Sequence, residues 1–262
     1  MNRGRTILAT WTAAAIGVGI CIAAHAESDW RGSTGVDFSS GDYGSEVDTE
    51  ILYVPLSLRY RSFPWTAKIT VPYIRIEGPV GVVGGAGGGG GVIIGDGGGT
   101  RTESGIGDIF GSIKYSVDPV TEGAPYIDLT SKVKFPAADE DKDLGTGEFD
   151  YTVEADFAWK TGRVFPFVAV GYQFLGDPDG FDLNDRFKVS LGIDMKVVVD
   201  VNLGALYDWK EASTDESDDP NEAVAYVNWK ASDRVSVNAY VYTGLSDGSP
   251  DWGAGLQISL RR

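Results

Sequence analysis

From Trp30 to the end of the chain, apolar and polar residues alternate in short segments that are separated by turn-forming residues. A period of two places alternate side chains on opposite faces of a β-strand, whereas a helix would repeat every 3.6 residues. No stretch of the chain follows the helical period. The sequence therefore predicts an all-β protein whose strands each have one apolar and one polar face.

The alternating segments predict about twelve strands, and the connections between them alternate in length. The strands are expected at residues 30–39, 50–61, 64–77, 105–117, 124–136, 148–160, 163–175, 183–195, 198–210, 222–230, 234–243 and 251–260. Short connections such as Thr161–Gly162 and Met195–Val197 alternate with long ones such as Gly78–Ser104 and Ala137–Gly147. Transmembrane barrels have tight periplasmic turns and longer outer loops. We therefore expect an antiparallel transmembrane β-barrel with every long loop outside.

The apolar faces of the strands are expected to contact lipid and the polar faces to line the lumen. The charged residues of the polar faces are the candidate lumen lining: Arg59, Lys68, Asp108, Lys114, Asp128, Lys132, Glu154, Asp156, Arg186, Lys188, Asp194 and Asp200. Two interpretations remain open for them. Cross-strand ion pairs would fill and stiffen the lumen, whereas unfilled space between them would give a polar pore.

Residues 1–26 have the pattern of an export signal, with basic Arg3 and Arg5, an apolar run from Ile7 to Ala24 and a small-x-small cleavage site. We expect cleavage before Glu27, which leaves residues 27–262 as the barrel domain. An uncleaved anchor helix is the alternative.

The single Cys and the single His of the chain, Cys21 and His25, both lie in this predicted signal. Their removal excludes disulfides, Cys or His metal sites, thiol nucleophiles and His-dependent triads from the mature chain. We therefore predict no catalytic residue, no cofactor and no metal site in the barrel, and we do not expect an enzyme.

The chain is acidic, with a formal net charge of −16, which makes nucleic acid an unsuitable partner. Much of the acid lies in the expected outer loops, for example in residues 139–143 and 215–219. These carboxylates could simply keep the loops solvated. They could also hold divalent cations that bridge to anionic lipid headgroups, because clustered carboxylates suit hard cations.

The longest expected connection, residues 78–104, contains a glycine tract. It has neither the helix nor the Gly-Lys-Ser/Thr pattern that a nucleotide-binding glycine loop requires. A mobile outer loop and a loop folded into the pore are both compatible with it. Because Val92-Ile93-Ile94 gives the segment an apolar anchor, we predict that residues 78–104 control access to the lumen.

Several short motifs carry a resemblance to a known family. They are Gly105-Ile-Gly-Asp-Ile109 leading into Lys114-Tyr115, Val133-Lys-Phe-Pro136 before Asp139, Leu144-Gly-Thr-Gly147 with Asp150 beyond it, and Gly171-Tyr172. In these motifs the chain resembles the outer-membrane transporters known as "MetA-pathway of phenol degradation" proteins. It departs from them at Ala137-Ala138, where the family usually has Thr-Gly, and in ending on Arg262 rather than on an aromatic residue.

The resemblance implies a barrel in the outer membrane of a Gram-negative bacterium, with outer-membrane lipid around it and a small-molecule solute inside it. Our leading hypothesis is a channel or transporter for small, aromatic or hydrophobic molecules. The alternative is a non-conducting structural or adhesive surface barrel.

Overall fold

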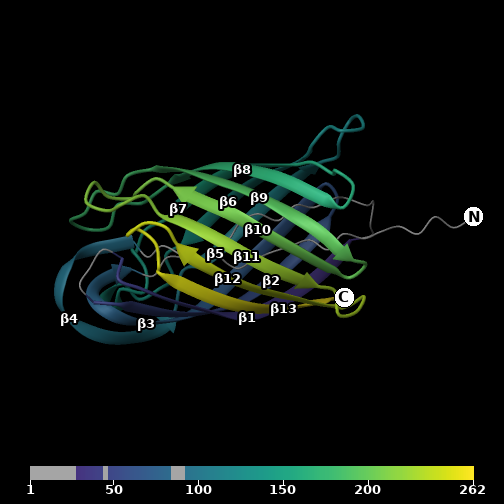
Figure 1. Ribbon diagram of the computed structural model, residues 1–262. Coiled ribbons are helices and arrows are strands. Elements are labelled where there is room, and N and C mark those ends of the chain that lie inside the picture. The colour runs from purple at the N-terminus through teal and green to yellow at the C-terminus, as the bar shows by residue number, and fades with distance from the viewer. Residues whose placement is uncertain (1–27, 44–46, 84–91) are drawn as a thin grey trace, which may run out of the picture.

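The computed structural model describes residues 28–43, 47–83 and 92–262, and in these ranges the chain forms one closed antiparallel β-sheet (Figure 1). Its strands are β1 (Asp29–Gly41), β2 (Thr49–Ser62), β3 (Trp65–Val83), β4 (Val92–Ile106), β5 (Ile109–Val117), β6 (Tyr126–Phe135), β7 (Asp150–Ala158), β8 (Val164–Phe174), β9 (Arg186–Val198), β10 (Val201–Lys210), β11 (Asn221–Trp229), β12 (Val235–Gly244) and β13 (Trp252–Arg261). The ring closes where β1 pairs with β13. The predicted export signal lies outside the described residues.

β4 and β5 together occupy one strand position of the barrel wall, and we call each such full-length position a stave. β3 pairs with β4 beyond Tyr73 and with β5 from Trp65 to Thr70, so β4 and β5 succeed each other along the same neighbour. The break falls at Gly107–Asp108, where the Gly107 N–H donates a 3.0 Å hydrogen bond to the Pro72 carbonyl. The barrel therefore has twelve staves, which confirms the predicted fold class.

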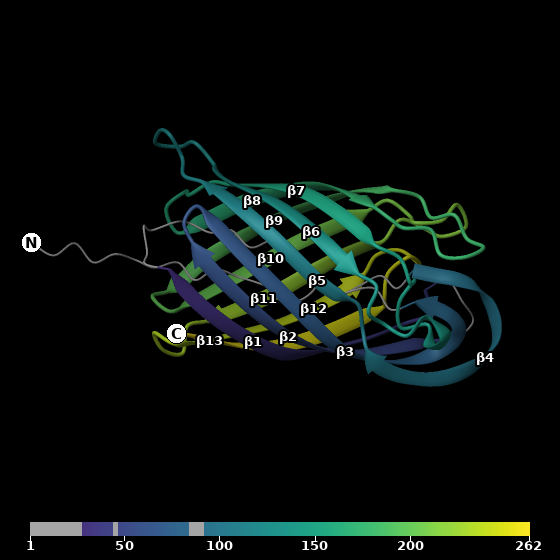
Figure 2. The same ribbon diagram turned by 180° about the vertical axis from the view of Figure 1, so that it is seen from behind.

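The short and long connections lie at opposite ends of the barrel, as Figures 1 and 2 show. The C-terminus lies at the short-turn end, where the Arg262 N–H donates to the Trp30 carbonyl at 2.9 Å. The turn predicted at Met195–Val197 is displaced, because β9 continues to Val198 and the turn falls at residues 199–200. Strand ends depend on pairing with neighbours, which the alternation of one segment does not encode.

The predicted long loop at residues 78–104 is largely wrong. β3 continues to Val83 and β4 begins at Val92, and the two pair beyond the rest of the wall, with Gly78 opposite Arg101. This hairpin extends past the barrel rim on the long-loop side (Figure 2). The glycine tract of residues 84–91 lies outside the described residues. The backbone of β4 pairs with β3 along this length, so glycines that had suggested a loop instead lie in a strand.

The barrel is apolar outside and polar inside. Leu191 and Ile193 are 50% and 47% exposed on the outer face, whereas Asp156 and Ser190 are each 2% exposed on the inner face. Aromatic pairs lie near both ends of the staves, with Trp30 against Tyr60 at the short-turn end and Phe38 against Trp252 at the long-loop end. An outward apolar band between aromatic girdles fits a bilayer. This architecture places the protein in the Gram-negative outer membrane.

In the part of the chain that the structure describes, no helix is long and apolar enough to cross a membrane. The one helical element described is a short 3-10 turn, Glu140–Lys142, in the connection between β6 and β7.

Candidate functional site

The candidate site is the inner wall of the barrel, which the strand registers divide into rows. A row is a set of residues that lie directly opposite one another on successive strands, so their side chains share one face. Ten of the twelve predicted lumen residues lie on the inward parity of a strand. Asp108 is also buried, at the break between β4 and β5. Asp200 is a correction: it is exposed in the turn before β10, because the chain reverses there rather than pairing.

Several predicted residues form ion pairs inside the barrel. Lys114 lies 3.0 Å from Asp128 and 3.8 Å from Asp156. Lys188 lies 2.5 Å from Glu154, although β8 separates the strands that carry them. Gly171 is the residue of β8 between them, and a Cβ there would lie 3.0 Å from the Lys188 Cγ. The small residue in the Gly171-Tyr172 motif therefore lets a cation reach a carboxylate two strands away.

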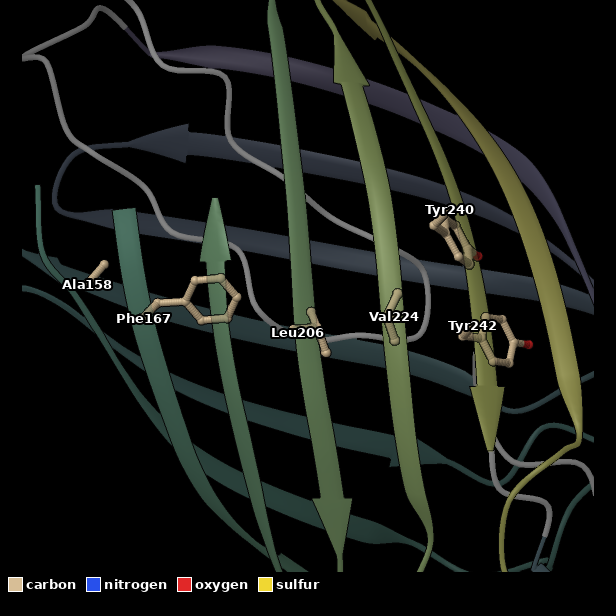
Figure 3. Close-up of a cluster of buried hydrophobic side chains, with 6 residues drawn as sticks. All are labelled: Ala158, Phe167, Leu206, Val224, Tyr240 and Tyr242. Atoms are coloured by element: carbon tan, nitrogen blue, oxygen red, sulfur yellow. The ribbon is translucent and has the colours of Figure 1, made fainter. Parts of the chain in front are cut away.

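An apolar band crosses the inner wall beside these charges. Ala158, Phe167, Leu206, Val224, Tyr240 and Tyr242 form one buried cluster, and their side chains follow one another across the wall in Figure 3. Phe167 lies opposite Gly192, which lies opposite Leu206, so the row continues across β9. This band was not predicted from the sequence. Part of its signal was present, because Leu206 interrupts the otherwise polar or small inward residues of β10, and Phe165 and Phe167 make the inward side of β8 apolar.

A buried carboxylate, Asp37, was also not predicted from the sequence. It is 2% exposed and accepts hydrogen bonds from the hydroxyls of Tyr240 and Tyr242, at 2.7 and 3.0 Å. Asp194 is held similarly, by the Asn202 side-chain amide at 2.8 Å. These contacts satisfy inward carboxylates with neutral donors.

The family-like motifs converge on the outer end of the lumen. Asp108 accepts hydrogen bonds from the backbone N–H groups of Ala137 and Ala138, both at 3.1 Å. The Lys134 ammonium lies 3.4 Å from Asp108 and 3.0 Å from Asp150. These contacts fix both ends of the connection formed by residues 136–149. The motifs therefore act as structural determinants of this connection.

The same connection inserts an apolar side chain into the barrel mouth. Leu144 is 1% exposed and forms a cluster with the inward-facing residues Ile51, Tyr53, Ile74 and Ile76. Arg101 of the β3–β4 hairpin forms an ion pair with Asp143 beside it. Residues 136–149 thus cover part of the inner wall at the outer end, a position that the sequence had suggested only for residues 78–104.

The described residues contain no group of three or more His, Cys, Asp or Glu side chains arranged to hold a metal ion.

Residues 34–261 match the family described as "Putative MetA-pathway of phenol degradation". The chain belongs to this family. No curated protein matches the sequence. This family membership agrees with the resemblance carried by the Gly105–Ile109 and Leu144–Gly147 motifs.

Solved structures show which known folds this family member resembles. The COG4313 outer membrane channel from Pseudomonas putida F1 is similar with a TM-score of 0.71 and 14% identity, covering 91% of this chain and 97% of that one. The translocator domain of the autotransporter NalP from Neisseria meningitidis has a TM-score of 0.51 and 9% identity, over 90% and 88% of the two chains. At these identities the likeness establishes the fold alone, and folds of one shape serve different functions.

Proposed function

We propose that the barrel is an outer-membrane channel that admits small, aromatic or hydrophobic molecules into its lumen, with outer-membrane lipid around it. The observation that carries this proposal is the apolar band of the inner wall (Figure 3). Elsewhere on the inner wall, ion pairs such as Lys114–Asp128 and Lys188–Glu154 link the strands. Here Phe167, Leu206 and Val224 form an apolar strip beside charged rows, which suits a solute with an apolar body and a polar group.

Conductance of the refolded protein in planar lipid bilayers tests the channel, and block of the current by phenol tests the apolar band. We expect discrete conductance steps and a phenol-dependent reduction of current. Val224→Thr keeps the volume of the inward side chain but adds a hydroxyl, so it should weaken the block. Val241→Thr on the outward face is the matched control and should leave the block unchanged.

One observation favours the non-conducting alternative. Leu144 covers inner-wall residues at the barrel mouth, and ion pairs occupy part of the interior. A protein that runs as a folded barrel yet gives no conductance steps would support that alternative and contradict the channel.

A further inference from the structure

One row of the inner wall carries basic charge without any acidic residue. In order along the registers its members are Arg261, Arg31, Arg59, Lys68, Ser112, Lys132, Thr152, Gln173 and Arg186. We call it the basic row. The sequence alone shows these residues scattered over β13, β1, β2, β3, β5, β6, β7, β8 and β9, and only the pairing registers bring them into line.

The basic row runs from one end of the barrel to the other. Strands of a barrel tilt against its axis, so a row perpendicular to the strands climbs the wall. Its first members, Arg261 and Arg31, lie at the short-turn end, and its last, Arg186, begins β9 at the long-loop end. A solute that follows the row would therefore traverse the lumen.

The middle of the row holds two lysines without a carboxylate beside them. Among the described residues, neither Lys68 nor Lys132 has an acidic side chain within 4.0 Å. Along the row, Lys68 lies directly opposite Arg59, and only Ser112 separates it from Lys132. Cations gathered on a buried wall attract a mobile anion, because the low-polarity surroundings screen their charges weakly.

Nearby carboxylates do not neutralise this pair, because other lysines engage them. The Glu154 carboxylate lies 2.5 Å from the Lys188 ammonium, and Asp128 and Asp156 lie 3.0 and 3.8 Å from the Lys114 ammonium. Lys132 instead lies over the ring of Phe110, with its ammonium 5.7 Å from the ring centroid. The pair thus combines positive charge with an adjoining aromatic surface.

We propose that the basic row is a binding site for small organic carboxylates, with Lys68 and Lys132 as its central anion-binding pair. The solute carboxylate accepts charge-assisted hydrogen bonds from the two ammonium groups, and its apolar body lies against the wall beside Phe110. This inference rests on the proposed function in placing the solute inside the lumen, and it narrows the solute class to anions.

Equilibrium binding of benzoate to the folded, detergent-solubilised protein tests the site, with uncharged benzyl alcohol as the matched ligand. We expect benzoate to bind more tightly than benzyl alcohol, and the double variant Lys68→Gln, Lys132→Gln to weaken benzoate by about tenfold or more. Benzyl alcohol binding should not change. Lys160→Gln, at an exposed lysine outside the row, is the control and should bind benzoate normally.

The pair Lys68→Arg, Lys132→Arg keeps both charges and should retain benzoate binding, which separates loss of charge from loss of folding. Equal affinity for the two ligands, or undiminished benzoate binding by a folded Gln variant, would overturn the proposal. So would loss of binding in both the Gln and the Arg variants.

Ion selectivity separates this inference from the proposed channel. In a KCl gradient, the reversal potential of the wild-type protein should indicate a greater preference for chloride than that of the Gln double variant. Benzoate binding without any conductance would support the anion-binding site and contradict the proposed channel function. Conductance would support the channel but contradict the anion-binding site if benzoate and benzyl alcohol bound with equal affinity. The same would follow if wild type and the Gln variant had the same benzoate affinity and chloride preference.

Discussion

The hydroxyl of Tyr240 donates a 2.7 Å hydrogen bond to the carboxylate of Asp37, a residue 203 positions away in the chain. β13 lies between the strands that carry them, so this bond crosses the seam at which the barrel closes. Two glycines of β13 make room for it. A Cβ at Gly255 would lie 2.2 Å from the ring of Tyr240, and one at Gly253 would lie 2.1 Å from the ring of Tyr242. The seam therefore joins a buried carboxylate to two tyrosines that lie over glycine.

Removing a tyrosine hydroxyl at this seam should destabilise the barrel. Tyr240→Phe leaves one lone pair of the buried Asp37 without its donor, which costs about 1–3 kcal/mol. Urea unfolding in detergent micelles, followed by tryptophan fluorescence, measures the loss. Tyr60→Phe is the control, since Tyr60 lies on the outer face against Trp30. Equal free energies of unfolding for the two variants would contradict a role for the hydroxyl.

Filling the space between Gly255 and the Tyr240 ring should destabilise the barrel to a similar extent, through a steric clash rather than a lost hydrogen bond. Gly255→Ala would push a methyl group into the Tyr240 ring, and overpacking of this kind costs about 1–3 kcal/mol. Gly32→Ala is the matched change, because a Cβ there meets nothing within 4 Å. The fraction of protein that shows heat-modifiable migration after refolding compares the two. If both alanines refold alike, the close approach of ring and backbone carries no cost.

The strand pattern could be predicted from sequence because each stave repeats one simple rule. Leu191 and Ile193 alternate with Ser190 and Asp194, and the bilayer outside and the lumen inside enforce that alternation over the whole wall. The twelve staves followed from the number of such segments. The break at Gly107–Asp108 did not, since it depends on Pro72 and on the loop that Asp108 holds.

The organisation of the lumen was predictable only in part. Charged residues could be assigned to the inner face from parity, but rows depend on registers between strands, which one sequence does not contain. Lys68 and Lys132 are far apart in the chain, and nothing local indicates that both belong to the row that contains Arg59. Leu144 was missed for a related reason, because a loop residue shows no periodicity that would reveal its burial.

Charge on the outer face should be tolerated according to depth in the bilayer. Leu191→Arg places a cation in the apolar band near mid-strand, where the cost is about 2–4 kcal/mol. Val199→Arg, in the turn between β9 and β10, should cost about 0–1 kcal/mol because the side chain reaches the interface. Unfolding in phospholipid vesicles measures the difference. Similar costs at both positions would mean that the outer face does not contact lipid as the exposed side chains indicate.

The connection formed by residues 136–149 should respond to changes at Leu144 and Asp108. Leu144→Ser removes the side chain that packs against Ile51 and Ile74, and a polar group there disfavours the buried position. Asp108→Ala removes the acceptor for the Ala137 and Ala138 N–H groups. Both changes should release the connection while leaving the twelve-stave wall closed.

Trypsin cleavage measures the release of residues 136–149 directly, because Lys142 lies within this connection and its side chain is exposed. We expect faster cleavage after Lys142 in Leu144→Ser and Asp108→Ala than in the wild type, and a higher single-channel conductance because less of the mouth is covered. Glu140→Ala, at an exposed residue of the same connection, controls for changes in the cleavage sequence itself. Faster cleavage with unchanged conductance would show that Leu144 anchors the connection without limiting passage. Unchanged cleavage in both variants would show that neither Leu144 nor Asp108 holds it in place.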